Sequence, residues 1–300
     1  MKINNKQISI AALLTCHNRK EKTLSCLNKL INQDGINNVD LQIYLVDDGS
    51  TDGTSESIRQ NFPQVNILHG DGTLYWNGGM RFAFSEAMKY DHEYYLWLND
   101  DTLLNSDAVK ILLETSKNIT SELGKDMIVT GTVKDSESDE INYGGRIQKS
   151  KLQPLTFILL QNKSEPQRCD TFNGNAVLIP KSVVGKIGNI SIEFSKQHGG
   201  DFDYGLRAKY AGFESWVAPG IVAECSSNTI DGTIFDKSLS LKDRTKQMKS
   251  PKGVPPAKEW MVFTRLHGGF LWPYYWLRTI IRVLFPWTYL FLRRPPKNQS

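Results

Sequence analysis

Residues 94–103 decide the fold, and they read Tyr94-Tyr95-Leu96-Trp97-Leu98-Asn99-Asp100-Asp101-Thr102-Leu103. An aromatic and apolar run ends abruptly in an amide and two carboxylates. A buried strand that delivers acidic groups at its carboxyl end is a common way for an α/β protein to hold a divalent cation against a phosphorylated ligand. The stretch therefore predicts a central strand with a cation site just beyond it.

The sequence upstream predicts more of the same sheet. Three further β-rich runs lie at Ile8–Leu14, Leu41–Val46 and Val65–His69. Segments with helical spacing of apolar residues separate them, such as the segment from Met80 to Met88. This alternation is typical of βαβ units around a parallel sheet. We expect an α/β fold with a nucleotide-binding half over residues 1–105.

The remainder of the chain is less regular. Residues 106–225 carry a predicted strand near Ala176–Ile179 and complete a predicted catalytic domain over 1–225. Residues 226–258 are polar and rich in lysine, which predicts a flexible loop. Residues 259–300 form a predicted C-terminal segment that is aromatic, basic and amphipathic.

Composition limits the class of protein. The chain has 300 residues, 40% of them hydrophobic, and a net charge of +4, which is far below the charge density of a dedicated nucleic-acid binder. Its four cysteines form no Cys-x-x-Cys pair, so neither a disulfide framework nor a zinc site is indicated. We expect reduced cysteines and a cytoplasmic protein without a nucleic-acid partner.

The first group of polar residues follows the first two predicted strands. Thr15, His17 and Arg19 follow one strand, and Asp47 and Asp48 follow the next. Because parallel strands end at one edge of a sheet, an acid there can accept hydrogen bonds from a base or ribose. An Asp-Asp-Gly-Ser sequence alone is equally compatible with an ordinary turn that caps a helix.

The second group is the glycine-rich and aromatic stretch Gly70–Gly79, which contains Trp76, Asn77 and Gly78. We interpret it as a loop that leads into a helix beginning near Met80, whose N-terminus favours an anion. The alternative is a tight strand-to-helix connection whose aromatic residues belong to the core.

The third group is the opening stretch itself. Asn99 and Asp101 flank Asp100 in the pattern of an Asp-x-Asp metal motif whose first acid is an amide. Carboxylate and amide oxygens can bind Mg²⁺ or Mn²⁺, because such ions keep waters and take other ligands from substrate phosphates. Simple capping of the following helix is the alternative.

The fourth group opens a predicted helix beyond a glycine turn, where His198, Asp201 and Asp203 lie close together in sequence. One of these groups could accept a proton from an attacking hydroxyl. Alternatively, the two acids complement the helix dipole and pair with Arg207.

Taken together and in order, six stretches resemble the inverting glycosyltransferases of family 2, and in particular their rhamnosyltransferase-like bacterial branch. The resemblance implies the α/β GT-A fold, a Rossmann-like mixed, mostly parallel sheet flanked by helices, here with a C-terminal amphipathic helical extension. The resemblance spans roughly residues 8–225 and rests on Thr15–Arg19, Val46–Asp52, Trp76–Met80, Trp97–Thr102, Phe172–Pro180 and Gly200–Gly212.

The resemblance implies a role for each matching position. The residues implied in binding the nucleotide-sugar are Thr15, His17, Arg19, Asp47, Asp48, Trp76, Asn77, Gly78, Asn99, Asp100, Gly174 and Asn175. Asp101 is implied as the metal ligand, with Asn99 beside it, although many relatives have Asp at the latter position. Asp201 is implied as the general base. Because the family often shows Glu-Asp-x-Asp where this chain has Gly200-Asp201-Phe202-Asp203, Asp203 and His198 stay open as alternatives.

By the same resemblance, the protein is a metal-dependent hexosyl- or deoxyhexosyltransferase that uses Mg²⁺ or Mn²⁺. Its implied partners are a nucleoside-diphosphate sugar donor and a saccharide or polyprenyl-linked glycan acceptor of bacterial surface polysaccharide synthesis. Two other classes stay open: a non-catalytic protein that binds sugar nucleotides, and a nucleotidyltransferase. The latter lacks support because no glycine-rich triphosphate signature follows the first strand.

The C-terminal segment suggests a further partner. Residues 270–294 are dense in aromatic and aliphatic side chains, but prolines and arginines interrupt them, which disfavours a transmembrane span. Arg278 and Arg282 lie one helical turn apart, which suits a helix in a membrane interface. We expect a peripheral contact with the cytoplasmic face of the inner membrane. The alternative is a helix docked on the protein's own core.

Overall fold

The computed structural model describes residues 7–226, 236, 238–250 and 253–285. Its strands are β1 (Ile8–Cys16), β2 (Val39–Asp47), β3 (Val65–His69), β4 (Tyr94–Leu98), β5 (Leu103–Leu104), β6 (Ile128–Asp135), β7 (Ile141–Tyr143), β8 (Gly145–Ser150), β9 (Gln153–Leu159), β10 (Gln167–Cys169), β11 (Thr171–Phe172), β12 (Ala176–Pro180) and β13 (Ser215–Cys225). Its α-helices are α1 (Lys20–Ile31), α2 (Thr54–Asn61), α3 (Tyr75–Ala87), α4 (Ala108–Leu123), α5 (Lys181–Ile187), α6 (Gly200–Tyr210), α7 (Leu241–Met248), α8 (Ala257–His267) and α9 (Trp272–Leu284).

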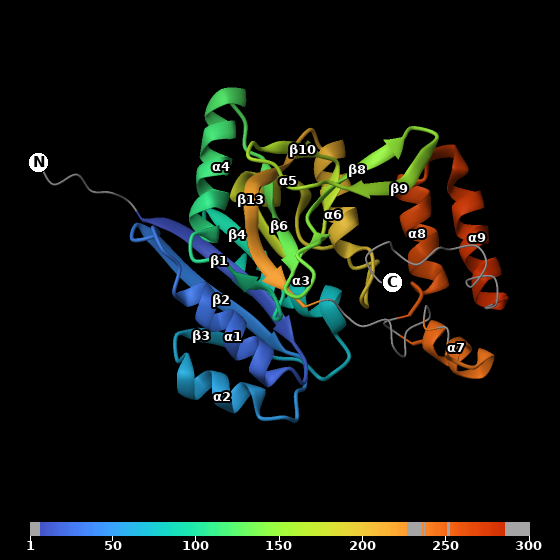
Figure 1. Ribbon diagram of the computed structural model, residues 1–300, viewed down its shortest axis with the longest axis horizontal. Helices are drawn as coiled ribbons and strands as arrows, with labels where there is room; N and C mark the ends of the chain where they lie inside the picture. Colours follow the sequence, from blue (N-terminus) through green and yellow to red (C-terminus); the bar gives the residue numbers. More distant parts are fainter. Residues whose placement is uncertain (1–6, 227–235, 237, 251–252, 286–300) are drawn as a thin grey trace, which may run out of the picture.

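A mixed sheet forms the centre of the molecule, with the strand order β10-β13-β6-β12-β4-β1-β2-β3 (Figure 1). Strands β1, β2, β3 and β4 are parallel to one another, which agrees with the predicted βαβ units. Strand β12 runs antiparallel to β4 and pairs Ala176 with Leu98. The start of β12 therefore lies beside the end of β4, at the edge where the acidic residues emerge.

The core lies in two layers on either side of this sheet, as the alternation along β1 requires. Ile10, Ala12 and Leu14 belong to the cluster that includes residues of α1 and α4. Ala11 and Leu13 belong to the opposite cluster, which includes residues of α3 and α6. Strand β1 is thus buried on both faces.

Strands β3 and β4 have the predicted bounds, but the predicted start of the third helix was wrong. Helix α3 begins at Tyr75 rather than near Met80, so Gly78 and Gly79 lie inside it and not in a loop. A Cβ atom on Gly79 would lie 2.1 Å from the hydroxyl oxygen of Thr15. Gly79 therefore permits close packing of the helix on β1, and neither glycine breaks the helix.

The predicted loop over 226–258 also needs correction, because helix α7 lies within it. The hydroxyl of Ser240 caps α7 by accepting a hydrogen bond from the backbone N–H of Asp243, at 3.1 Å. Met248 and Val254 are buried against Val283 of α9. Residues 227–235, 237 and 251–252 of the predicted loop lie outside the described residues.

The small sheet β11-β8-β9 and the helices α8 and α9 lie on one side of the central sheet (Figure 1). Within the described ranges, no helix has both the length and the apolar character needed to cross a bilayer. The predicted membrane segment 270–294 is described only as far as residue 285.

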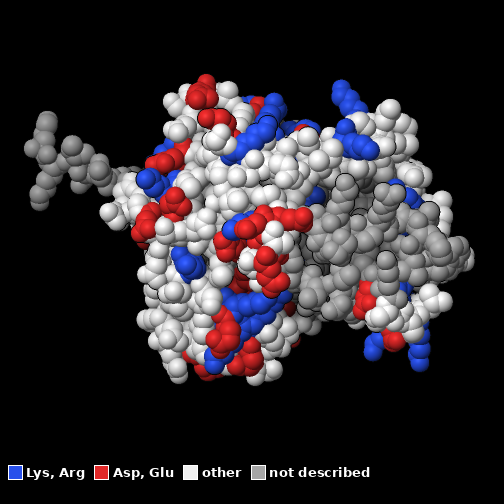
Figure 2. Space-filling view, viewed as in Figure 1, with Lys and Arg blue, Asp and Glu red and all other residues white. Residues whose placement is uncertain are grey.

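In the view of Figure 2, acidic and basic side chains are interspersed over the half that contains β1 to β3, in line with the small net charge.

Candidate active site

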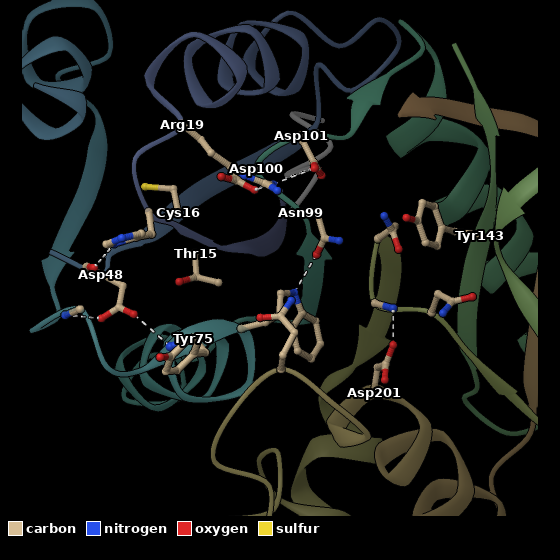
Figure 3. Close-up of a pocket in the computed structure, with 17 residues that line it drawn as sticks. Thr15, Cys16, Arg19, Asp48, Tyr75, Asn99, Asp100, Asp101, Tyr143 and Asp201 are labelled. Carbon is tan, nitrogen blue, oxygen red and sulfur yellow. Dashed lines mark hydrogen bonds and ion pairs between the residues drawn. The ribbon is translucent and has the colours of Figure 1, made fainter. Parts of the chain in front are cut away.

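A cavity of about 420 Å³ opens at the carboxyl ends of β1, β2 and β4, beside the start of β12 and of α6 (Figure 3). It collects residues from segments far apart in the sequence. The lining residues are Thr15, Cys16, His17, Arg19, Asp48, Gly72, Tyr75, Trp76, Asn99, Asp100, Asp101, Tyr143, Asn173, Gly174, Asn175, Gln197 and Asp201. Most of the residues predicted from the sequence therefore share one space.

Asp48 forms one end of the cavity and is held by backbone groups. Its carboxylate accepts hydrogen bonds from the backbone N–H groups of Gly72 and Tyr75, both at 2.9 Å. Its carbonyl oxygen accepts a hydrogen bond from Nδ1 of His17 at 2.6 Å. The neighbouring Asp47 faces elsewhere, because its carboxylate accepts hydrogen bonds from the backbone N–H of Ser50, at 2.9 Å, and from the Ser55 hydroxyl. Asp47 does not line the cavity.

The acidic pair beyond β4 shares one arginine, as Figure 3 shows. Nη1 of Arg19 donates to Oδ1 of Asp100 at 3.1 Å and to Oδ2 of Asp101 at 2.7 Å. Burial raises the pKa of Asp100 to about 6, although the adjacent guanidinium opposes that shift. Oδ2 of Asp100 is buried and has no hydrogen-bond partner among the described residues. A bound cation beside this oxygen would satisfy it.

Asn99 faces the same space but is already engaged. Its Oδ1 accepts a hydrogen bond from the indole N–H of Trp76 at 2.7 Å. The amide therefore positions Trp76 in the cavity wall and retains one lone pair for a cation. The described part of the chain contains no cluster of three or more His, Cys, Asp or Glu residues able to hold a metal. Two carboxylates and an amide fit Mg²⁺ or Mn²⁺, which take their other ligands from water and phosphate.

Asp201 forms the opposite end of the cavity, in the first turn of α6. Its carboxylate accepts hydrogen bonds from the backbone N–H groups of Phe202, at 2.8 Å, and Gly174, at 3.2 Å. Burial raises the pKa of Asp201, while these bonds and the positive charge of Arg146 oppose the shift. A raised pKa makes a carboxylate a better proton acceptor near neutral pH.

The other two candidate bases lie away from the cavity lining. The side chain of Asp203 is fully buried between Arg207 and His267, which both bind its carboxylate. The carbonyl of His198 accepts a hydrogen bond from the side chain of Asn77 at 3.0 Å. Of the three residues that the sequence left open, the cavity contains only Asp201.

Of the remaining predicted residues, some line the cavity and others do not. Thr15, Gly174 and Asn175 line the cavity, whereas Asn77 and Gly78 are buried within α3 and do not. Asn77 instead donates its backbone N–H to the carbonyl of Lys196 at 2.9 Å, which ties the helix to the segment preceding α6.

Sequence reasoning missed several lining residues. Asn173 lies within a quoted motif, and its side chain accepts a hydrogen bond from Nε of Arg146 at 3.0 Å. Tyr143 and Gln197 carry no local signal, because a short strand and a loop bring them to the cavity from outside any motif. Only long-range topology places these side chains.

Comparisons with known proteins fit this geometry. The profile of "Glycosyl transferase family 2" matches residues 12–185, which is more than half of the chain. A hyaluronan synthase from Pasteurella multocida is 30% identical over 114 residues, or 37% of this chain and 11% of that protein. A chondroitin synthase from Pasteurella multocida (strain Pm70) is 34% identical over 93 residues, or 30% of this chain and 9% of that protein. The chain thus matches about a tenth of the length of these curated relatives.

A solved structure of GalNAc-T7 with UDP, GalNAc and Mn²⁺ superimposes with a TM-score of 0.60 at 12% sequence identity. The similarity covers 82% of this chain and 48% of that one. At this identity the likeness concerns the fold alone, and it confirms the predicted GT-A architecture.

Proposed function

The chain belongs to glycosyl transferase family 2, and we propose that it is an inverting glycosyltransferase. In this proposal it moves a sugar from a nucleoside-diphosphate sugar to a hydroxyl of a glycan or lipid-linked acceptor. One observation carries the proposal: a single cavity is lined by Asp48 at one end, by the pair Asp100 and Asp101 between, and by Asp201 at the other end (Figure 3).

The donor half of the cavity suits a nucleotide. Asp48 and His17 lie at the end formed by β1 and β2, where Thr15 also faces the space. Carboxylate, imidazole and hydroxyl groups at this sheet edge can hydrogen-bond a base and a ribose. We assign the base and ribose to this end and the diphosphate to the space in front of Arg19.

The acidic pair is the proposed metal site, with Asp101 as the principal ligand and Asn99 beside it. When bound, Mg²⁺ or Mn²⁺ would neutralise negative charge that develops on the departing diphosphate. Arg19 would add positive charge to the same region, because its guanidinium already lies against both carboxylates. The buried, unpartnered oxygen of Asp100 is the structural support for a cation at this place.

Asp201 is the proposed general base. It would take the proton from the acceptor hydroxyl while the hydroxyl oxygen attacks the anomeric carbon in line with the leaving diphosphate. A single displacement inverts the anomeric centre. Gly174 orients the carboxylate through its backbone N–H, and the raised pKa of Asp201 suits proton acceptance.

We further propose a rhamnosyltransferase-like enzyme of the hexosyl- or deoxyhexosyltransferase type that serves bacterial surface polysaccharide synthesis. The support is the ordered set of motifs, together with relatives that are named hyaluronan synthase and chondroitin synthase. A polyprenyl-linked acceptor would require the enzyme to work at the cytoplasmic face of a membrane.

Helix α9 supports such a location. Large apolar side chains follow one another along its exposed face at intervals of three and four residues, from Tyr274 through Leu277 and Ile281 to Leu284. Arg278 lies exposed beside this stripe, and Arg282 follows one turn later. We propose that this face lies in the headgroup region of a membrane with anionic lipids, where apolar residues insert and arginines meet phosphates.

A screen of nucleotide-sugars tests the enzymatic proposal. Each donor is incubated with the protein and Mn²⁺ or Mg²⁺, and released nucleoside diphosphate and thermal stability are both measured. The cognate donor at a hundred times its dissociation constant should add about 2.7 kcal/mol to stability. Stabilisation without turnover, even with acceptor glycans present, would identify a binding protein. Release of inorganic diphosphate from a nucleoside triphosphate would identify a nucleotidyltransferase.

A further inference from the structure

The C-terminal helix α8 binds the helix that carries Asp201. Both oxygens of the buried Asp203 carboxylate on α6 are engaged: Nε of Arg207 donates to Oδ2 at 2.7 Å, and Nε2 of His267 donates to Oδ1 at 3.0 Å. His267 is the last residue of α8 and is only 3% exposed. The contact joins segments that are 64 residues apart in the sequence.

The contact between His267 and Asp203 also determines the direction in which Asp201 projects from α6. Successive residues of an α-helix are rotated by roughly 100°, so Asp201 and Asp203 project roughly 200° apart, on nearly opposite sides of α6. With Asp203 fixed against His267, Asp201 must face the cavity. There it accepts the backbone hydrogen bond of Gly174 (Figure 3).

The other end of α8 holds the segment that precedes α6. Oε1 of Glu259 accepts a hydrogen bond from the Ser195 hydroxyl at 2.6 Å. Between the two polar contacts, the ring of Phe263 packs edge-on against Phe194, with 6.0 Å between ring centroids. Helix α8 therefore contacts both the segment that contributes Gln197 to the cavity and the helix that contributes Asp201.

We propose that His267 is a positioning residue for the transfer reaction: through Asp203 it fixes the rotation of α6 that directs Asp201 at the acceptor. The proposal rests on the proposed function, in which Asp201 is the base. The family profile ends at residue 185, so both helices lie beyond the matched region, and nothing in the match assigns a role to α8. Helix α8 is thereby part of the catalytic unit.

Substitutions at His267 separate the hydrogen bond from the packing. His267→Phe keeps a ring against Phe263 and Tyr210 but removes the donor to Asp203. His267→Gln can place an amide nitrogen near the position of Nε2, whereas His267→Asn has the same chemistry but is too short to reach. We expect kcat to fall on the order of tenfold or more in the Phe and Asn variants, with little change in donor KM, and to recover in the Gln variant.

Hydrogen exchange provides a readout that does not need turnover. The backbone amides of residues 199–203 should exchange faster in the Phe and Asn variants than in the wild type and the Gln variant, while those of α4 stay unchanged. If no nucleotide-sugar is turned over by the wild type, the proposed function fails, but the exchange data still test the positioning of α6. Folded Phe and Asn variants with wild-type kcat and wild-type exchange over 199–203 would overturn the proposal. If the His267→Phe variant does not fold, the proposal is tested by comparing kcat and exchange between the His267→Gln and His267→Asn variants.

Discussion

Nη1 of Arg19 lies 2.7 Å from Oδ2 of Asp101 and 3.1 Å from Oδ1 of Asp100, so one guanidinium holds both carboxylates of the proposed metal site. A cation that binds these carboxylates must compete with Arg19. Once displaced, the guanidinium is free to meet the diphosphate of the donor.

Arg19→Gln should therefore strengthen the binding of Mn²⁺ to the nucleotide-free protein. Charge-assisted hydrogen bonds contribute about 1.5–3 kcal/mol, so the dissociation constant should fall by about tenfold or more. Electron paramagnetic resonance titration of free Mn²⁺ measures this. Arg59→Gln, at an exposed position of α2, is the matched control. Equal or weaker binding by the Arg19 variant would contradict a direct competition.

Asp201→Asn should fold normally and bind donor normally, but transfer should slow on the order of a hundredfold or more if Asp201 is the base. The amide preserves the shape of the side chain and cannot accept the proton. Circular dichroism, donor affinity and initial rates are measured together, with Asp40→Asn on the exposed surface of β2 as control. A variant with wild-type turnover would refute the assignment of Asp201.

The pH profile should report the environment of the base. Burial raises the pKa of Asp201, so the base becomes protonated, and kcat/KM falls, at a pH above the usual carboxyl range. The positive charge of Arg146 lowers that pKa. Arg146→Gln should therefore move the acid limb of kcat/KM to higher pH, whereas Lys149→Gln, exposed on the same strand, should leave it in place. A shift to lower pH would contradict the proposed role of Asp201.

Gly174→Ala should weaken donor binding, because the new Cβ would lie 2.5 Å from the Trp76 ring. Relief requires movement of Trp76 and loss of its bond to Asn99. Overpacking of this kind costs about 1–3 kcal/mol of folding stability. Isothermal titration with the donor measures the loss of affinity that accompanies the displacement of Trp76. Gly185→Ala adds the same methyl group to α5, where nothing lies within 4 Å, and serves as control. Unchanged donor affinity in the Gly174 variant would show that Trp76 does not shape the donor site.

Leu277→Glu combined with Ile281→Glu should abolish flotation of the protein with anionic liposomes, because both changes place carboxylates on the exposed apolar stripe of α9. Leu152→Glu, at an exposed apolar position between β8 and β9, should leave flotation unchanged. Equal flotation of all three proteins would exclude this face of α9 as the membrane contact.

The sequence predicted the strands of the first hundred residues well, because they are short apolar runs with clear ends. Strand β4 and the residues that follow it could be placed for that reason. Helix α3 was placed too late because the whole stretch Gly70–Gly79 was interpreted as a loop, although Gly79 lies within the helix and packs closely on Thr15.

Other parts of the site depend on contacts that local patterns do not encode. The choice between Asp201 and Asp203 depends on the rotation of α6, which a residue far along the chain, His267, helps to fix. The pairing of Arg19 with Asp101 joins residues 82 positions apart in the sequence. Neither contact can be predicted from the spacing of hydrophobic residues along the chain.

Because β12 runs antiparallel to β4, its first residue lies beside the last residue of β4. The cavity at this edge is therefore lined by two separate stretches of the chain. Every lining residue from Thr15 to Asp101 precedes α4, and every one from Tyr143 to Asp201 follows it. Genetic recombination with a crossover inside α4 would therefore exchange one wall of the cleft as a block and leave the other wall intact. Such a layout lets natural variation, or a designed chimera, change what one wall recognises without rebuilding the wall opposite.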